Sequence, residues 1–269
     1  MTAGRRSPAA AVILVFLCGQ SCTVDYVVTR QGDVDPLGVA DGGRAAVTCY
    51  VLSPAGPVLL VAADMDTGYI RVANRWVSTE GLNSILAMAY DGSMFLVVAD
   101  DGSGASWYSL WPKSEHLIWL ASAAQYEGVA WTGSGWIAPR GDASLSGLAR
   151  YSSTATLAAG EPSALLPDMH YAHFTTDGER LYGIGNSANE VEVRSLSTGA
   201  VVQNVPLVQW DGWIVGLSVV GRTLFLLSGA SGDRFATIFS LDLDGGALVE
   251  RARIPGVMPG GLHCTASVL

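Results

Sequence analysis

The sequence predicts an all-β fold, a β-propeller of four-stranded blades, with six blades as the first count and five or seven as alternatives. Three observations favour it. A turn glycine recurs about 41 to 50 residues apart, which is the repeat length of a four-stranded blade. Strand-length runs rich in Val, Ile, Leu and aromatic residues lie between Gly, Asp and Ser. No sustained apolar period of 3.6 residues, as a helix would need, occurs between the turns.

Each repeat opens with a short strand, a turn and a stronger apolar strand, which together predict the inner hairpin of a blade. Asp-Gly or Thr-Gly suits such a turn because glycine adopts positive φ without steric cost. The five clear examples are residues 37–40 and 45–51 around Gly42, 85–90 and 94–99 around Gly92, 128–131 and 136–138 around Gly133, 173–176 and 181–184 around Gly178, and 215–220 and 224–227 around Gly221.

The second half of each repeat recurs as well. Residues 238–246 match residues 191–199, and residues 66–68 (Asp-Thr-Gly) occupy a similar place in the first repeat. We interpret these segments as outer hairpins.

The two ends of the chain predict how the ring closes. Residues 261–264 align with residues 128–131 and 216–219, so we expect a sixth inner strand there, in an incomplete blade. The strand-like residues 24–29 would complete that blade, pairing the N- and C-terminal strands and protecting the edges.

Residues 174–182 resemble the inner hairpin of TolB-like and YVTN-type propellers, and residues 66–68 are similar to the outer turn of quinoprotein-like blades. The resemblance covers nearly the whole chain after its first residues. It implies an architecture and leaves the ligand open, because such propellers serve in binding, scaffolding and catalysis.

The N-terminus predicts export. Arg5 and Arg6 precede an apolar run over residues 9–17, which is too short to span a bilayer as a helix. We interpret residues 1–21 as a signal peptide and residues 22–269 as a single propeller domain.

Cys22 resembles the lipidated cysteine of bacterial lipoproteins, although Gly19 and Gln20 depart from the usual signal. The resemblance implies a lipid anchor on the inner or outer membrane, facing the periplasm or the cell surface. Cleavage after Ser21 to give a soluble secreted protein is the alternative.

The charge argues against one class of partner. The formal net charge is −9 and no basic cluster is present, so binding to a phosphate backbone through counterion release is disfavoured. We expect no nucleic-acid partner.

Cys49 and Cys264 remain outside the signal peptide, and an oxidising compartment would allow them to form a disulfide. Counting from the turn glycines in a six-bladed ring places them in neighbouring blades, about 10 Å apart in height. Because a bridge requires Cα atoms within about 7 Å, this count favours two buried thiols.

No motif predicts a metal or a cofactor. Asp168, His170 and His173 form the one cluster with metal-ligand chemistry, but His170 and His173 would lie on opposite faces of a strand. The acidic pairs lack the further oxygens that a calcium loop needs. Serine-elbow, phosphate-loop and dinucleotide motifs are absent.

The segments that enter the inner strands carry the candidate binding residues, because such loops gather on one face of a propeller. They combine aromatic with polar side chains, as ligand sites and protein interfaces do; packing between blades is the alternative role for several of them. The candidates are Tyr126, Glu127, His170, Tyr171, His173, Trp210, Asp211 and Trp213.

We therefore expect a non-enzymatic module that binds an envelope protein or a small extracellular ligand. The alternative is a hydrolase or lyase acting on a carbohydrate or metabolite at the channel mouth, with Glu127, His173 and Asp211 as the groups to test. A purely structural role is also open.

Overall fold

The computed structural model describes eleven stretches of the chain, all within the compact unit Ala45–Leu269. They are residues 47–54, 58–76, 82–112, 116–123, 128–140, 147–166, 169–184, 190–207, 213–229, 235–255 and 260–266. In these stretches the chain is almost entirely β-structure, as the sequence predicts.

The strands form five antiparallel four-stranded sheets, the blades of a propeller. Blade 1 is β20 (Gly260–Thr265), β1 (Thr48–Ser53), β2 (Val58–Asp64) and β3 (Ile70–Trp76). Blade 2 is β4 (Ser84–Tyr90), β5 (Phe95–Asp100), β6 (Ala105–Leu110) and β7 (Leu117–Ser122). Blade 3 is β8 (Ala130–Trp131), β9 (Trp136–Pro139), β10 (Leu148–Tyr151) and β11 (Ala164–Leu166), with the short helix α1 (Thr154–Ala158) after β10. Blade 4 is β12 (His173–Thr176), β13 (Arg180–Ile184), β14 (Glu190–Ser195) and β15 (Val201–Pro206). Blade 5 is β16 (Trp213–Val220), β17 (Thr223–Gly229), β18 (Phe235–Asp242) and β19 (Val249–Pro255).

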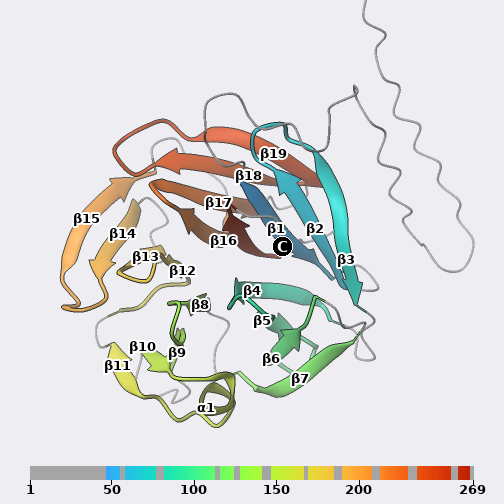
Figure 1. Cartoon of the computed structure of the whole chain (residues 1–269), viewed down its shortest axis with the longest axis vertical. Coiled ribbons are helices and arrows are strands. Elements are labelled where there is room, and N and C mark those ends of the chain that lie inside the picture. Colours follow the sequence, from blue (N-terminus) through green and yellow to red (C-terminus); the bar gives the residue numbers. More distant parts are fainter. Residues whose placement is uncertain are drawn as a thin grey trace, which may run out of the picture. The chain divides into compact units, whose positions relative to one another are not determined.

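The innermost strands close a ring. In the order β4, β8, β12, β16 and β20, each contacts the next, and β20 contacts β4 again. Figure 1 shows the five sheets arranged around a common centre. The first count of six blades is therefore wrong, and the alternative of five is correct.

The miscount has a specific cause. Residues 260–265 do not begin a sixth blade; they pair antiparallel with β1 and supply the inner strand of blade 1. The ring thus closes inside blade 1, between a segment near the start of the chain and one near its end. Residues 24–29, the predicted closing strand, and residues 37–40, the predicted first inner strand, lie outside the described residues.

The inner hairpin turns at Gly92, Gly133, Gly178 and Gly221 are confirmed, whereas the one predicted at Gly42 lies outside the described residues. An aspartate organises two of the confirmed turns. Asp91 accepts hydrogen bonds from the backbone N–H groups of Ser93 and Met94 at 2.8 Å each. Asp177 accepts from the backbone N–H groups of Glu179 and Arg180 at 2.9 and 2.7 Å. These side-chain bonds add to a backbone bond across each turn, which the N–H of the same aspartate donates to the carbonyl of Met94 or Arg180.

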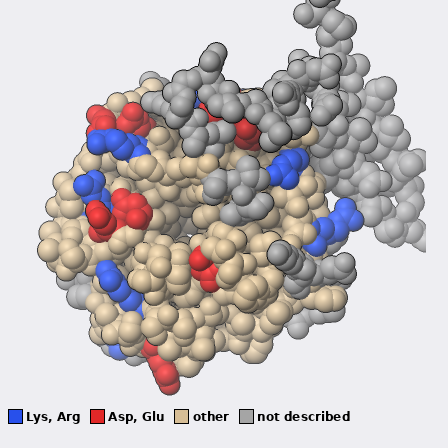
Figure 2. Space-filling view, in the orientation of Figure 1, with Lys and Arg blue, Asp and Glu red and all other residues tan. Residues whose placement is uncertain are grey.

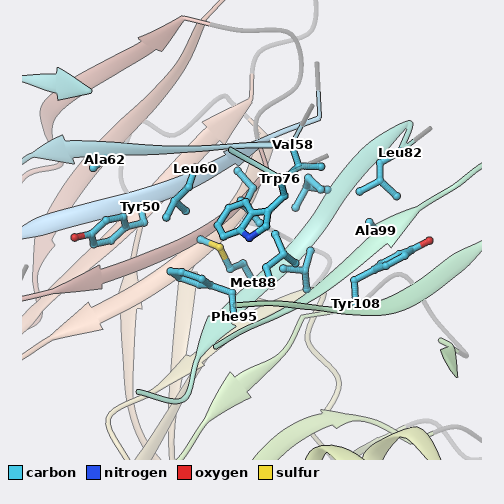
Figure 3. Packing of buried hydrophobic residues seen from close by; sticks show 14 residues of the cluster. Tyr50, Val58, Leu60, Ala62, Trp76, Leu82, Met88, Phe95, Ala99 and Tyr108 are labelled. Carbon is cyan, nitrogen blue, oxygen red and sulfur yellow. The ribbon is translucent and has the colours of Figure 1, made fainter. Parts of the chain in front are cut away.

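Apolar side chains fill the spaces between blades. In Figure 3, residues from blades 1 and 2 interdigitate, among them the fully buried Trp76 and Phe95. Their ring centroids are 6.5 Å apart, in a nearly perpendicular arrangement. The Trp76 indole N–H donates to the carbonyl of Trp111 at 3.0 Å, so its polar atom is also satisfied. Burial of each such side chain contributes about 1.5–3 kcal/mol.

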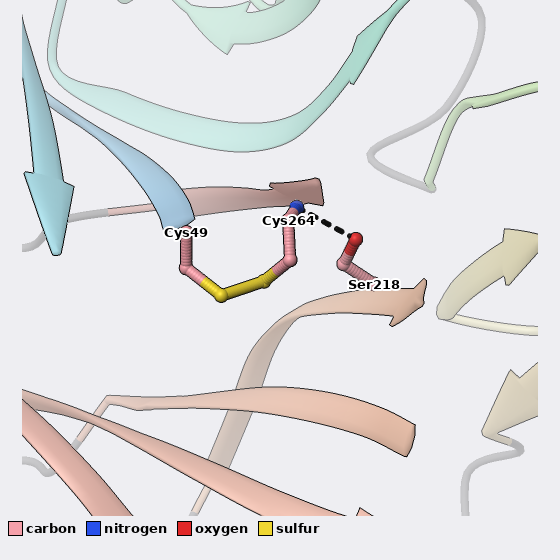
Figure 4. Close-up of a disulfide and its surroundings, with 3 residues drawn as sticks. All are labelled: Cys49, Ser218 and Cys264. Atoms are coloured by element: carbon pink, nitrogen blue, oxygen red, sulfur yellow. Dashed lines mark hydrogen bonds between the residues drawn. A yellow bond between two sulfur atoms is a disulfide. The ribbon is translucent and has the colours of Figure 1, made fainter. Parts of the chain in front are cut away.

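Cys49 and Cys264 form a disulfide, so the expectation of two separate thiols is wrong. They are directly paired residues of β1 and β20, with Cα atoms 4.0 Å apart (Figure 4). The predicted height difference assumed that the two residues stood in different blades. Because β1 and β20 are antiparallel strands of one blade, the number of residues between each cysteine and its turn glycine does not give a difference in height between them.

The described residues include no helix that is long and apolar enough to cross a membrane.

Candidate functional site in the central channel

The five inner strands run in the same direction along the channel, because their early residues surround one cavity and their later residues surround another. We call the part lined by the early residues the entry half and the part lined by the later residues the exit half. The entry half contains Leu86, Ala87, Met88, Gly128, Val129, His173, Phe174, Gly216, Leu217, Gly261 and Leu262. Its open space is about 10 Å³, at the threshold for one water molecule.

The exit half is wider and more polar. Its open space is about 70 Å³, enough for a few water molecules. The residues around it include Tyr90, Trp131, Thr175, Thr176, Leu217, Ser218, Val219, Leu262, His263 and Cys264.

Glycines make the entry half narrow. A Cβ on Gly216 would stand 2.8 Å from the Cβ of Leu262, and a Cβ on Gly261 would stand 2.6 Å from the Cβ of Met88. Gly261 also has φ +66°, which few other residues adopt. Neighbouring inner strands therefore approach more closely than side chains would allow, and the channel narrows there.

His263 is the imidazole of the exit half. Its ring lies 5.5 Å from that of Tyr90 and 6.1 Å from that of Phe95, measured between centroids. Burial lowers the pKa of His263 to about 4, so the imidazole is neutral at pH 7. A neutral imidazole offers one hydrogen-bond donor and one acceptor.

Ser218 links two inner strands in the same half. Its Oγ accepts a hydrogen bond from the backbone N–H of Cys264 at 2.8 Å (Figure 4). The hydroxyl proton of Ser218 is left for a second bond. Ser218, Thr175 and His263 occupy equivalent places in their strands, each two residues after the first channel-lining position.

His173 lies in the wall of the entry half. Burial lowers its pKa to about 4, so it too is neutral at pH 7. The sequence-based interpretation placed it on the rim with Tyr126 and Glu127, and with Trp210 and Asp211; these four lie outside the described residues.

Tyr171 is buried over blade 4. Its ring occupies the space where a Cβ of Gly183 would stand, and its hydroxyl donates to Glu192, which also accepts from Arg194. Burial, followed by the Glu192 hydrogen bond, raises the pKa of Tyr171. These contacts give Tyr171 a packing role, whereas its neighbour His170 is exposed.

Trp213 is the most exposed of the large apolar side chains described, at 73 %. It begins β16 at the entry side, and its partner across the ladder is Gly229, which in turn pairs with Ala236. Phe235, which begins β18 next to Ala236, is 51 % exposed. The start of blade 5 therefore presents two aromatic side chains to solvent.

Sequence reasoning did not select Tyr90, Thr175 or Ser218, which help to form the exit half. The alignment of inner strands contained a signal for Ser218 and His263, because both follow an aligned Gly-Leu pair. That signal marks a position in the strand and says nothing about the width of the channel.

Charge is sparse near the channel. On the face shown in Figure 2, most charged side chains lie toward the periphery, and one acidic side chain lies near the centre. In the described part of the chain, no three His, Cys, Asp or Glu side chains form a group that could hold a metal ion.

A ring of five four-stranded sheets around a narrow channel defines a five-bladed β-propeller. No protein-family model matches the chain, and no curated protein matches it. Several solved structures are similar to it. TolB from Acinetobacter baumannii has a TM-score of 0.47 at 15% identity, over 83% of this chain and 67% of that one.

A chain of a nidogen/laminin complex has a TM-score of 0.50 at 12% identity, over 81% of this chain and 98% of that one. BamB from Moraxella catarrhalis has a TM-score of 0.35 at 15% identity, over 74% of this chain and 56% of that one. At 12% identity, the likeness to the nidogen/laminin chain concerns the fold alone.

Proposed function

We propose that the protein is an exported β-propeller, anchored to the envelope by lipid on Cys22, that binds an envelope protein through its entry face. The Cys49–Cys264 disulfide is the observation that supports export. Disulfides persist in oxidising compartments and are rare in the reducing cytosol. This bridge joins the segments that close the ring, so the folded state itself benefits from oxidation.

Binding is favoured over catalysis by the chemistry of the channel. Both channel histidines, His173 and His263, have pKa values near 4 because they are buried, which is too low for proton transfer near neutral pH. The entry half has about 10 Å³ of open space, too little for a substrate. A partner at this end of the channel would contact the surface around the entry, where Trp213 and Phe235 are exposed.

An exposed tryptophan at the edge of a rigid sheet is suited to protein recognition. Aromatic side chains are enriched at the centres of interfaces, since they bury a large area at a low cost in conformational entropy. Trp213 can supply such an anchor without disturbing the ring, because most of its surface already faces solvent.

Fractionation of cells tests export and anchoring. We expect the mature protein in the membrane fraction, with its N-terminal peptide bearing acyl chains on Cys22 by mass spectrometry. Cys22→Ala should move the protein to the soluble exported fraction. Retention in the cytosol with a free N-terminal methionine would overturn export, and a soluble unacylated wild type would overturn the anchor alone.

Site-specific photocrosslinking tests the face. A photoreactive phenylalanine analogue in place of Trp213 should give a discrete protein adduct in living cells. The same analogue in place of Arg222, at the exit-side turn between β16 and β17, is the control. Equal adducts at both positions, or none at Trp213, would contradict the assignment of the entry face.

A further inference from the structure

The inner strands of the propeller leave one backbone edge unpaired, and that edge faces the channel. Each of β4, β8, β12, β16 and β20 stands at the end of its sheet, so it pairs with a neighbouring strand on one side alone. In an antiparallel pair, hydrogen-bonded and non-hydrogen-bonded residue pairs alternate. Every second residue of an inner strand therefore directs its N–H and C=O groups into the channel.

The hairpin turns show which residues these are. The N–H of Asp91 donates to the carbonyl of Met94 at 3.2 Å, so these two residues form a hydrogen-bonded pair. The preceding residue, Tyr90, then belongs to a non-hydrogen-bonded pair, and its backbone groups point away from β5 into the channel. The same turn bond in blades 3 and 4 assigns Trp131 and Thr176 to the same level of the exit half.

Blade 1 shows how one N–H group of this level is satisfied. The N–H of Cys264 points away from β1 and donates to the Oγ of Ser218 in blade 5 at 2.8 Å (Figure 4). Alanine occupies the place of Ser218 in blades 2 and 3, as Ala89 and Ala130, and its side chain has no acceptor. The equivalent N–H groups of blades 3 and 4 therefore lack such a bond and remain open to the channel.

Two side chains add further polar groups to the exit half. Thr175 and His263 both border its open space. The ring of His263 contacts those of Tyr90 and Phe95, and no described residue forms a hydrogen bond with its nitrogens or with the hydroxyl of Thr175. A hydroxyl and a neutral imidazole can each donate and accept. Donors and acceptors thus surround the space on several sides.

The size and charge of the space limit what can fill it. Its volume of about 70 Å³ corresponds to about five to seven water positions, at about 10–15 Å³ each. The residues around it carry no charge at pH 7, since the imidazole is neutral. An ion would lose its water there without an opposite charge to replace it. The lining therefore favours a neutral ligand.

The mixture of donors and acceptors narrows the class further. Because backbone N–H and C=O groups alternate along each inner strand, a ligand group that both donates and accepts can bond at any position. Hydroxyl groups have this property, whereas a carboxamide separates its donors from its acceptor.

We propose that the exit half of the channel is a binding site for a small neutral polyol of about six non-hydrogen atoms, the size of glycerol. Its hydroxyl groups bond to the open backbone groups of the inner strands, to the hydroxyls of Thr175 and Ser218 and to the imidazole of His263. The site is independent of the entry face and of the lipid anchor, so its failure leaves the proposed function untouched.

Carbon-13 NMR of the histidine rings in the mature protein tests the proposal, with glycerol as the probe. The chain has four histidines, and His263→Phe identifies the signal of His263. We expect glycerol to shift that signal saturably, with a dissociation constant of about 10 mM or lower, which about six non-hydrogen atoms can supply. The signals of the exposed His116 and His170 should not move.

Two variants locate the site. Thr175→Val removes one hydroxyl, keeps the branched shape and should raise the dissociation constant for glycerol about three- to tenfold. His173→Phe is the matched control, because it replaces the other buried imidazole of the channel, in the entry half, and should leave the constant unchanged. Circular dichroism and melting temperatures establish that each variant is folded, and the wild-type titration stands without them.

Sodium acetate and potassium chloride, titrated in the same way, distinguish a neutral site from an ion site. A saturable glycerol shift confined to His263 and weakened by Thr175→Val alone supports the polyol site. A shift that grows linearly at all four histidines, or no saturation by about 100 mM glycerol, would overturn it. Tighter binding of acetate or potassium than of glycerol would overturn it as well.

Discussion

Blade 1 and blade 5 have the same strand order in space but are assembled differently. Blade 5 is a run of consecutive hairpins, from β16 to β19. Blade 1 takes its inner strand from β20, and the residues that it joins, Cys49 and Cys264, are 215 positions apart. A blade built from one segment needs local contacts alone, whereas blade 1 must pay the entropy of closing the whole ring.

The equivalent strand pairs show how the protein meets that cost. Where blade 1 has Cys264 opposite Cys49, blade 5 has Val219 opposite Leu224. Blades 2 and 3 have aromatic pairs at this place, Tyr90 with Phe95 and Trp131 with Trp136, each with ring centroids 4.7 Å apart. Apolar packing holds the contiguous blades, and a covalent bond holds the discontinuous one.

Removal of the disulfide should have the largest effect. Cys49→Ala with Cys264→Ala releases a loop of 215 residues, for which the chain-entropy model gives about 5 kcal/mol. We expect a melting temperature about 10 to 20 °C lower. Thermal denaturation measures it, and wild type treated with a reductant should melt with the double variant.

A change at the matching pair of blade 5 sharpens the comparison. Leu224→Ala should also destabilise the protein, by about 2–5 kcal/mol, because it leaves a cavity. Its melting temperature should nevertheless remain sensitive to reductant, and hydrogen exchange of β20 should stay slow. Fast exchange of β20 in Leu224→Ala but not in the cysteine variant would contradict the distinction between the blades.

The next prediction concerns the pH dependence of stability, to which blade 1 should contribute and blade 5 should not at the equivalent position. The pKa of His263 is lowered to about 4 in the folded state, below the ordinary value of 6.5. The unfolded chain therefore binds the proton more readily, and the stabilisation present above pH 6.5 is lost as the pH falls toward 4.

His263→Gln removes that titration, and Ser218, at the equivalent place in blade 5, does not titrate. Between pH 7 and pH 4, we expect the free energy of unfolding of the variant to fall by up to about 3 kcal/mol less than that of wild type. Urea unfolding at several pH values measures the difference. Parallel curves for the two proteins would mean that His263 is solvated in the folded state.

A methyl group at Gly216 should cost about 1–3 kcal/mol, because Gly216→Ala overpacks the junction of β16 and β20 against Leu262. The equivalent residue of blade 2 is already Ala87, opposite Val98. Ala87→Gly is therefore the control, and its effect should be smaller. Chemical denaturation compares the two, and a neutral Gly216→Ala would show that the inner strands can move apart.

The smallest effects should distinguish two aromatic residues of the entry segments. Tyr171→Phe leaves Glu192 without its hydroxyl donor and should cost about 1 kcal/mol. Trp213→Ala should change stability by less than about 0.5 kcal/mol, since the side chain is exposed. Calorimetry of both variants measures this, and a larger loss for Trp213→Ala would place that residue in the packing of blade 5.

Much of the fold could be predicted because its signals are local. Gly92, Gly133, Gly178 and Gly221 all follow inner strands and have positive φ, as their spacing indicated. The alignment of Gly261 with Gly128 and Gly216 also held, since all three line the entry half. These features depend on short stretches of sequence and on the repeat period.

What failed depends on pairing between distant segments. Nothing in the sequence states that β20 pairs with β1, so residues 260–265 were assigned to a sixth blade and Cys264 was separated from Cys49. The candidate site met the same limit. His173 and Tyr171 are close in sequence. His173 lines the channel, whereas Tyr171 is buried over blade 4 and its hydroxyl donates to Glu192.

The discontinuity of blade 1 also sets an order of events in time. During synthesis at about 5–20 residues per second, β1 precedes its inner partner by roughly 10 to 40 s. For that interval, one edge of β1 has no ladder to join, although β2 and β3 can already pair with it. A free thiol at Cys49 therefore indicates that the ring has not yet closed. Formation of the disulfide with Cys264 indicates that it has.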